Sequence, residues 1–353
     1  MKRNGFIDVI KFMFAIIIAE FHLESGIFPG GRMGCEVYFM ISGYLMMCSL
    51  AKDKSTDNVA SSTVRFIWRK YKALFWFLLP AAIISYVVIC IFKEWTLGHS
   101  LLRAPLLAFE IVPLYGTGML GEYVVGVSWY LSSMFIALAI LYPLCRKFRR
   151  GFTLMACPII GVLGYGTLSH FFGHLAVNKQ YVPETIIRSG LLRGIACCAL
   201  GCFLYELCKL ISKKNVARVG RAIFTTVELL GYTYLAYIMH HYGKSIYEYV
   251  LVFVIFMLLF IGINGLSFAS YLWNTKWTKH LGTMSTLIIL SHSCWARYLE
   301  GVLGKGFQKT AAVWWYVLAV VLTSVAVYLC SILLKRLFAS LSKIKLFEKT
   351  EKM

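Results

Sequence analysis

Long hydrophobic runs separated by short polar connections dominate the chain. A bilayer core about 30 Å thick takes around 20 helical residues to cross, and ten segments have this length and character. We predict spans at residues 6–23, 34–50, 73–92, 128–145, 152–173, 190–211, 222–241, 247–268, 281–300 and 312–337. The first differs from a signal peptide because Lys11, Glu20 and His22 interrupt its apolar run. The pattern predicts an all-α transmembrane bundle in one domain, residues 1–340, with a basic tail at 341–353.

Composition supports this interpretation. Of 353 residues, 59% are hydrophobic and 15% are charged, whereas a soluble domain has about 25% charged residues. The net charge of +20 would suggest nucleic acid in a soluble chain, but in a polytopic one it reflects Lys and Arg kept in cytoplasmic loops. Most Lys and Arg residues lie in the connections on the side of the N-terminus. We therefore expect a multi-pass plasma-membrane protein with both termini cytoplasmic and no nucleic-acid partner.

Two ionisable residues of the first predicted span share a helix face. Lys11 and His22 are eleven residues apart, which is about 20° beyond three full turns and about 16 Å along the axis. Ionisable groups inside a span are costly and mark functional sites, so a cation and a potential general base would line one side of a path. The alternative is that Lys11 snorkels inward and His22 bonds at the interface.

Further polar residues are candidates at the outer end of other predicted spans. Glu36 lies level with His22 and would orient its ring, unless it is an interfacial carboxylate in contact with water. Arg193 lies in the outer half of a predicted span and is a further candidate. His292 is a second site histidine or a core residue, and Trp129 is a candidate whose alternative is the aromatic belt.

The eleven cysteines lie in apolar stretches without CxxC or Cys/His metal spacing. We interpret them as small buried hydrophobes and expect no metal.

Several motifs together resemble the acyltransferase-3 family of integral membrane acyltransferases. The chain has Lys11, ten residues and His22, where that family has Arg, ten residues and His. The other matching segments, in the family's order, are Phe28-Pro-Gly-Gly31, Gly34 to Leu45, Phe66-Ile-Trp-Arg69-Lys70-Tyr-Lys72, Ser128-Trp129-Tyr130-Leu131, Arg193 with Gly201, Leu281-Gly282-Thr-Met-Ser285, and Ser291-His292.

The resemblance implies transfer of an acyl group, usually acetyl from acetyl-CoA, to a hydroxyl of an extracytoplasmic or lipid-linked carbohydrate. The residues fit this chemistry, because Arg69, Lys70, Lys72 and Lys11 would supply cations for the phosphates of the donor. His22 would be the general base that a sugar hydroxyl needs. Arg193 would contact donor, acceptor or Glu36, and Trp129 would stack on a sugar or belong to the aromatic belt. The competing interpretation is a carrier or flippase for a polar or anionic solute, since intramembrane Lys, Arg and His also mark transport paths.

Overall fold

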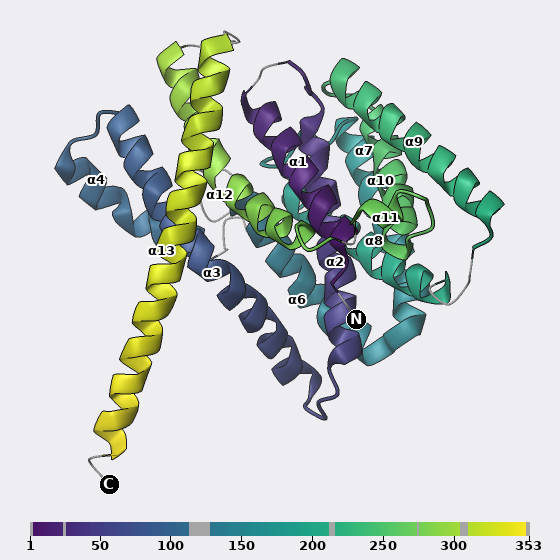
Figure 1. The fold of residues 1–353 in the computed structure, drawn as a ribbon, viewed down its shortest axis with the longest axis horizontal. Coiled ribbons are helices and arrows are strands. Elements are labelled where there is room, and N and C mark those ends of the chain that lie inside the picture. Colours follow the sequence, from purple (N-terminus) through teal and green to yellow (C-terminus); the bar gives the residue numbers. More distant parts are fainter. Residues whose placement is uncertain are drawn as a thin grey trace.

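The computed structural model describes residues 3–23, 26–112, 128–211, 216–273, 275–303 and 310–350, and these are almost entirely helical (Figure 1). Within these residues, Tyr181 and Arg188 form one isolated antiparallel β-bridge. The elements are α1 (Gly5–Leu23), η1 (Gly31–Met33), α2 (Gly34–Lys52), α3 (Val59–Phe92), α4 (Leu97–Arg103), η2 (Ala104–Leu106), α5 (Leu107–Ile111), α6 (Ser128–Gly151), η4 (Phe152–Ala156), α7 (Cys157–Phe172), α8 (Ser189–Ile211), α9 (Arg218–His241), α10 (Tyr247–Asn264), α11 (Ser270–Trp273), α12 (Thr278–Leu303) and α13 (Thr310–Thr350).

Seven helical stretches of the described chain are long and apolar enough to cross a membrane. They are Gly31–Lys52, Val59–Phe92, Ser128–Phe172, Ser189–Ile211, Arg218–His241, Tyr247–Asn264 and Ala312–Ser340. Ser128–Phe172 contains two of the predicted spans. The all-helical fold and the multi-pass membrane character are therefore confirmed, whereas the total of about ten spans and the orientation of the termini stay predictions.

The two remaining predicted spans, 6–23 and 281–300, do form helices, α1 and α12, but their composition is more polar. Helix α1 contains three charged residues, Asp8, Lys11 and Glu20. These two helices pack against each other in the middle of the bundle, between α3 and α13 on one side and the α7 to α10 group on the other (Figure 1). Most side chains of α1 are buried or half-buried against other helices, and Asp8 and His292 are among the buried ones, whereas His22, Met13 and Ile16 are exposed.

Close backbone contact joins α2 to α8. A Cβ on Gly43 would lie 2.0 Å from the carbonyl oxygen of Cys198, and one on Gly201 would lie 2.1 Å from that of Met40. Only glycine permits such an approach between helices. The thiols of Cys197 and Cys198 donate to backbone carbonyls of α2. This contact fixes the depth of α8, and with it the position of Arg193.

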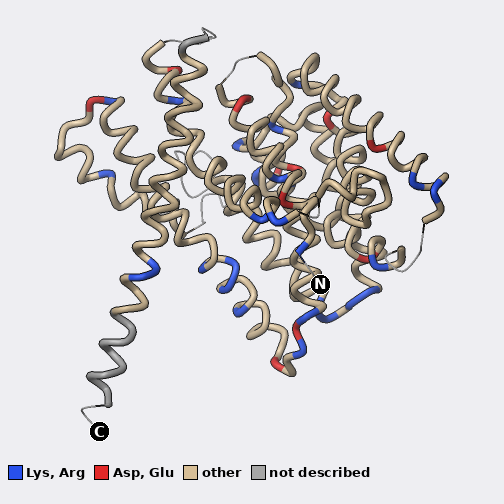
Figure 2. Tube along the Cα trace, in the orientation of Figure 1, with Lys and Arg blue, Asp and Glu red and all other residues tan. Residues whose placement is uncertain are grey.

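Lys and Arg gather on the N-terminal half of α3 and on the C-terminal end of α6, toward the lower edge of the view (Figure 2). Among them, Arg146 donates to Asp53 at 2.9 Å, and the hydroxyl of Tyr142 donates to the same carboxylate oxygen at 3.1 Å. Hydrogen bonds from Ser55 lower the pKa of Asp53 to about 2, with smaller contributions from Tyr142 and Arg146. This carboxylate ties the end of α2 to α6.

The predicted tail does not begin as a separate element, because α13 continues as one helix to Thr350. Residues 351–353 lie outside the described part of the chain.

Candidate active site

Two histidines meet where α1 packs on α12. The ring centroids of His22 and His292 are 5.1 Å apart, and the ring planes are inclined by 42°. His22 lies in the last turn of α1 and is exposed, whereas His292 is fully buried. The structure therefore places the two predicted site histidines side by side, although 270 residues separate them in sequence.

The environment of His292 determines which of its nitrogens carries hydrogen. Nδ1 lies 3.1 Å from the carbonyl oxygen of Ile288. A carbonyl only accepts, so Nδ1 is the donor, and Nε2 of the neutral ring is left as an acceptor. This buried Nε2 has no hydrogen-bond partner in the described structure. His292 is therefore held as an acceptor beside His22.

A cavity of about 200 Å³, which we call the His22 chamber, has His22 in its wall. It is lined by Ile18, Phe21, His22, Arg32, Cys35, Tyr38, Trp129, Tyr130, Ala176, Asn178, Lys244 and Ile289. His22, Arg32, Asn178 and Lys244 supply polar groups, and none of these described lining residues is acidic. The chamber thus combines one histidine with cationic and amide donors and an aromatic wall.

A second cavity of about 260 Å³, the Lys11 chamber, lies between five helices. Lys11 of α1 and Lys70 of α3 both line it, together with Ser42, Thr286 and mostly apolar residues of α2, α6 and α12. The Lys11 ammonium lies 5.6 Å from the ring centroid of Tyr38, whose hydroxyl donates to the backbone oxygen of Lys11 at 2.7 Å. One cation is therefore fixed against the wall of this chamber.

The two chambers share that wall. Tyr38, Tyr130 and Ile289 line both of them, and the rings of Tyr38 and Tyr130 meet edge to face at 6.1 Å. The predicted Lys11 face of α1 thus borders one chamber with Lys11 and the other with His22. Sequence reasoning gave no role to Tyr38 or Tyr130, although both lie in motifs quoted above.

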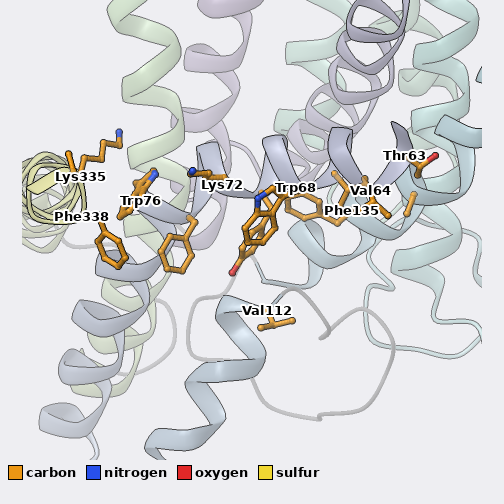
Figure 3. Close-up of a pocket in the computed structure, with 14 residues that line it drawn as sticks. Thr63, Val64, Trp68, Lys72, Trp76, Val112, Phe135, Lys335 and Phe338 are labelled. Atoms are coloured by element: carbon orange, nitrogen blue, oxygen red, sulfur yellow. The ribbon is translucent and has the colours of Figure 1, made fainter. Parts of the chain in front are cut away.

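The predicted basic cluster on α3 is divided. Lys70 lines the Lys11 chamber, but Lys72 lines a different, apolar groove of about 1080 Å³ on the opposite side of the helix. Figure 3 shows Lys72 beside Trp68 and Trp76, with Lys335 and Phe338 of α13 facing them. Arg69 is exposed and lines neither. Residues two apart on a helix point about 200° apart, so the three side chains do not converge.

Glu36 and Arg193 form a fully buried ion pair between α2 and α8. The same arginine donates to the backbone oxygen of Leu175 at 2.9 Å and to the side-chain oxygen of Asn178 at 2.7 Å. Its guanidinium carbon lies 5.6 Å from the ring centroid of Trp129. Arg193 thus holds the loop after α7 and supports two residues that line the His22 chamber, Asn178 and Trp129.

The predicted orientation of His22 by Glu36 stays a prediction. Arg193 occupies one carboxylate oxygen of Glu36, and neither Glu36 nor Arg193 is among the residues that line the His22 chamber. Of the three partners predicted for Arg193, namely the donor, the acceptor and Glu36, the structure shows the ion pair with Glu36.

A second buried ion pair escaped the sequence interpretation. Arg32 Nε lies 2.7 Å from Glu248 Oε1, with side-chain exposures of 8% and 1%. The other oxygen of Glu248 accepts from the backbone nitrogen of Leu175 at 2.7 Å. Glu248 and Arg193 therefore hold the two sides of the same peptide segment. The sequence does show Glu248 at the start of a predicted span, which could have identified it as a candidate. Its partners, Arg32 and Leu175, lie far away in the sequence.

Comparison with known proteins places nearly the whole chain in one family. A family model described as an acyltransferase domain matches residues 4–333. No curated protein and no solved structure matches the chain.

Proposed function

The chain belongs to the acyltransferase-3 family, and from this premise we propose that it transfers an acyl group, acetyl in our proposal, from cytoplasmic acyl-CoA to a hydroxyl of a cell-surface or lipid-linked carbohydrate. The enzyme would be a membrane-bound O-acyltransferase of the plasma membrane. The acyl group would cross the wall between the two chambers.

The shared wall is the observation that carries the proposal. A cytoplasmic thioester and an extracytoplasmic hydroxyl have to meet within the membrane, each arriving from its own side. The Lys11 chamber has two cations for an anionic donor, and the His22 chamber has a histidine and hydrogen-bond donors for a carbohydrate. The wall between the donor in one chamber and the carbohydrate in the other is formed by the shared residues Tyr38, Tyr130 and Ile289.

In the proposed reaction, neutral His22 accepts the proton of the acceptor hydroxyl as its oxygen attacks the thioester carbonyl carbon. A new C–O bond forms, the C–S bond breaks, and the thiolate of CoA takes the proton from the imidazolium. A positioned base of this kind contributes about 10² to 10⁴ in rate. Exposure of His22 in the chamber supports this role, since the attacking hydroxyl has to reach its ring.

The surrounding residues position the reactants. His292 steadies His22 from the buried side, and Trp129 offers an aromatic face to the carbohydrate. Arg193, paired with Glu36, keeps Asn178 and Trp129 in place and adds a positive field near the developing oxyanion. Lys11 and Lys70 attract the anionic donor, with Arg69 and Lys72 remaining candidates for its distal phosphates at the cytoplasmic surface.

Reconstitution tests the proposal. The purified protein in liposomes would receive labelled acetyl-CoA on one side and a carbohydrate acceptor on the other, and ester-linked label would be measured on the acceptor. Formation of the ester supports the transferase. Label that reaches the acceptor compartment without an ester would identify a carrier instead, because two chambers divided by a thin wall also suit a transport path.

Mass spectrometry of surface polysaccharides with and without the gene would identify the acceptor.

A further inference from the structure

Three cysteines from separate helices converge in the membrane domain. Cys145 of α6, Cys157 at the start of α7 and Cys202 of α8 have sulfur atoms within 4.8 Å of one another. Their exposures are 1%, 0% and 0%. The expectation that the cysteines merely fill space rested on local spacing, which does not reveal a cluster assembled by the tertiary fold.

A break in the helix brings Cys145 and Cys157 together. In an uninterrupted helix, residues twelve apart are about 18 Å apart along the axis. Here Arg149 has a positive φ of 51°, and the π-helix η4 follows at Phe152–Ala156. The chain therefore turns back between the two thiols. π-helical turns are rare in proteins, and those that do occur are often found at functional sites.

Cys202 differs from the other cysteines of α8. The thiols of Cys197 and Cys198 donate to carbonyl oxygens of α2 at 3.2 and 3.3 Å. Cys208 accepts from the side-chain amide of Asn264 at 3.1 Å. The thiol of Cys202 donates to the carbonyl oxygen of Gly43 at the longer distance of 3.8 Å, and its sulfur also lies beside the sulfurs of Cys145 and Cys157.

Three thiolates in this arrangement match the requirements of a soft metal ion. Zinc–sulfur bonds of about 2.3 Å place coordinating sulfurs about 4 Å apart, and the observed limit of 4.8 Å needs only a small contraction. Thiolates select ions such as Cu⁺ and Zn²⁺ over hard cations. We propose that Cys145, Cys157 and Cys202 bind one soft, thiophilic metal ion, which fastens the turn between α6 and α7 to α8. Binding releases the thiol protons to solvent.

Glu206 distinguishes the two ions. It follows Cys202 by one helical turn on the same face of α8, is buried, and lies 3.8 Å from Arg150. Zinc prefers four ligands, and Glu206, whose oxygens lie outside the group of three sulfurs, would have to move toward it to complete the zinc shell, whereas Cu⁺ is selected by soft thiolates. Replacement of Glu206 by Gln should therefore weaken Zn²⁺ binding and leave Cu⁺ binding unchanged.

The experiment uses the full-length protein in detergent, stripped with a chelator and titrated with Cu⁺ under reducing anaerobic conditions or with Zn²⁺, each against a chromophoric competitor. Metal retained after desalting is counted by mass spectrometry. We expect one ion per wild-type chain, no retention by Cys157→Ser, and full retention by the matched control Cys208→Ser on α8. Saturating metal should raise the melting temperature of the wild type and of Cys208→Ser, because a ligand bound to the folded state alone stabilises it.

Equal retention of either metal by the wild type and by Cys157→Ser would overturn the proposal, as would retention of neither metal by the wild type. If Cys157→Ser fails to fold, Cys145→Ser and Cys202→Ser provide the same comparison. If all three serine variants fail to fold, the apolar replacements Cys145→Ala, Cys157→Ala and Cys202→Ala provide the same comparison. Neither readout depends on acyl transfer, so the metal site and the proposed function can fail separately.

Discussion

The two chambers face each other across three shared residues but are built differently. The framework of the His22 chamber includes two buried ion pairs, Glu36 with Arg193 and Arg32 with Glu248, which hold the backbone around Leu175 from both sides. The Lys11 chamber is enclosed by apolar faces of five helices, and among the described residues neither of its two lysines forms a salt bridge with a carboxylate.

This difference fits two separate tasks. A rigid, charge-braced cavity suits precise placement of a hydroxyl against a base, because small displacements of reacting groups cost much of the rate. An apolar cavity with two ammonium groups suits a long, anionic thioester whose position depends less on fixed hydrogen bonds. The predictions below test whether the tasks separate as the two frameworks do.

The largest effect should come from His22→Ala. Loss of the general base should reduce acyl transfer by about 10² to 10⁴ while leaving donor binding near the wild-type value. His292→Ala should retain more activity, because that ring supports His22 and does not line the chamber. Turnover with labelled acetyl-CoA measures both variants. An acyl-histidine intermediate would give the same loss, and rapid trapping of labelled enzyme without acceptor separates the two routes. Wild-type turnover by folded His22→Ala would show that His22 is not the general base.

Arg193→Ala should destabilise the protein by about 3 to 5 kcal/mol, since it leaves Glu36 as an uncompensated buried charge. The double variant Arg193→Met with Glu36→Leu should recover part of this stability but not the activity, because Asn178 and Trp129 lose their support. Thermal unfolding in detergent and turnover measure the two quantities. Recovery of activity together with stability would show that the pair is only structural.

Lys70→Gln should raise the KM for the donor about tenfold, the size expected from the loss of one charge-assisted contact, with little change in the KM for the acceptor. Lys335→Gln is the control, since it removes the same charge from a side chain of α13 that faces the apolar groove and lines neither chamber. Equal effects of the two substitutions on the donor KM would mean that the Lys11 chamber does not select the donor.

The smallest effect concerns the anchor at the end of α2. Because the folded pKa of Asp53 is lowered to about 2, its stabilisation is present above the ordinary value near 4 and disappears as the pH falls from about 4 to about 2. Asp53→Asn should flatten the fall in melting temperature over this window by a few degrees. Asp57→Asn, which removes an exposed partner of Arg65 on the same connection, should keep the wild-type slope. A wild-type slope in Asp53→Asn would contradict the assigned pKa.

Hydrophobic pattern was enough to predict the helices and the shared face of Lys11 and His22, since both depend on local periodicity. The division of Lys70 from Lys72 follows from the same 100° rotation per residue, but the prediction treated three adjacent cations as one cluster. The ion pair of Arg32 with Glu248 and the thiol cluster join segments far apart in sequence. No local spacing encodes such contacts, because they depend on the packing of η1 on α10 and of α6, α7 and α8 on one another.

The most direct test of the central claim is a sided assay in sealed vesicles of defined orientation. Impermeant labelled acetyl-CoA and an impermeant carbohydrate acceptor would be supplied on the same side or on opposite sides. Ester formation is expected when the donor is on the side of the chain termini and the acceptor is on the opposite side, and it should be lost in His22→Ala. Equal ester formation with both substrates on the acceptor side would contradict a transfer that passes from the Lys11 chamber to the His22 chamber.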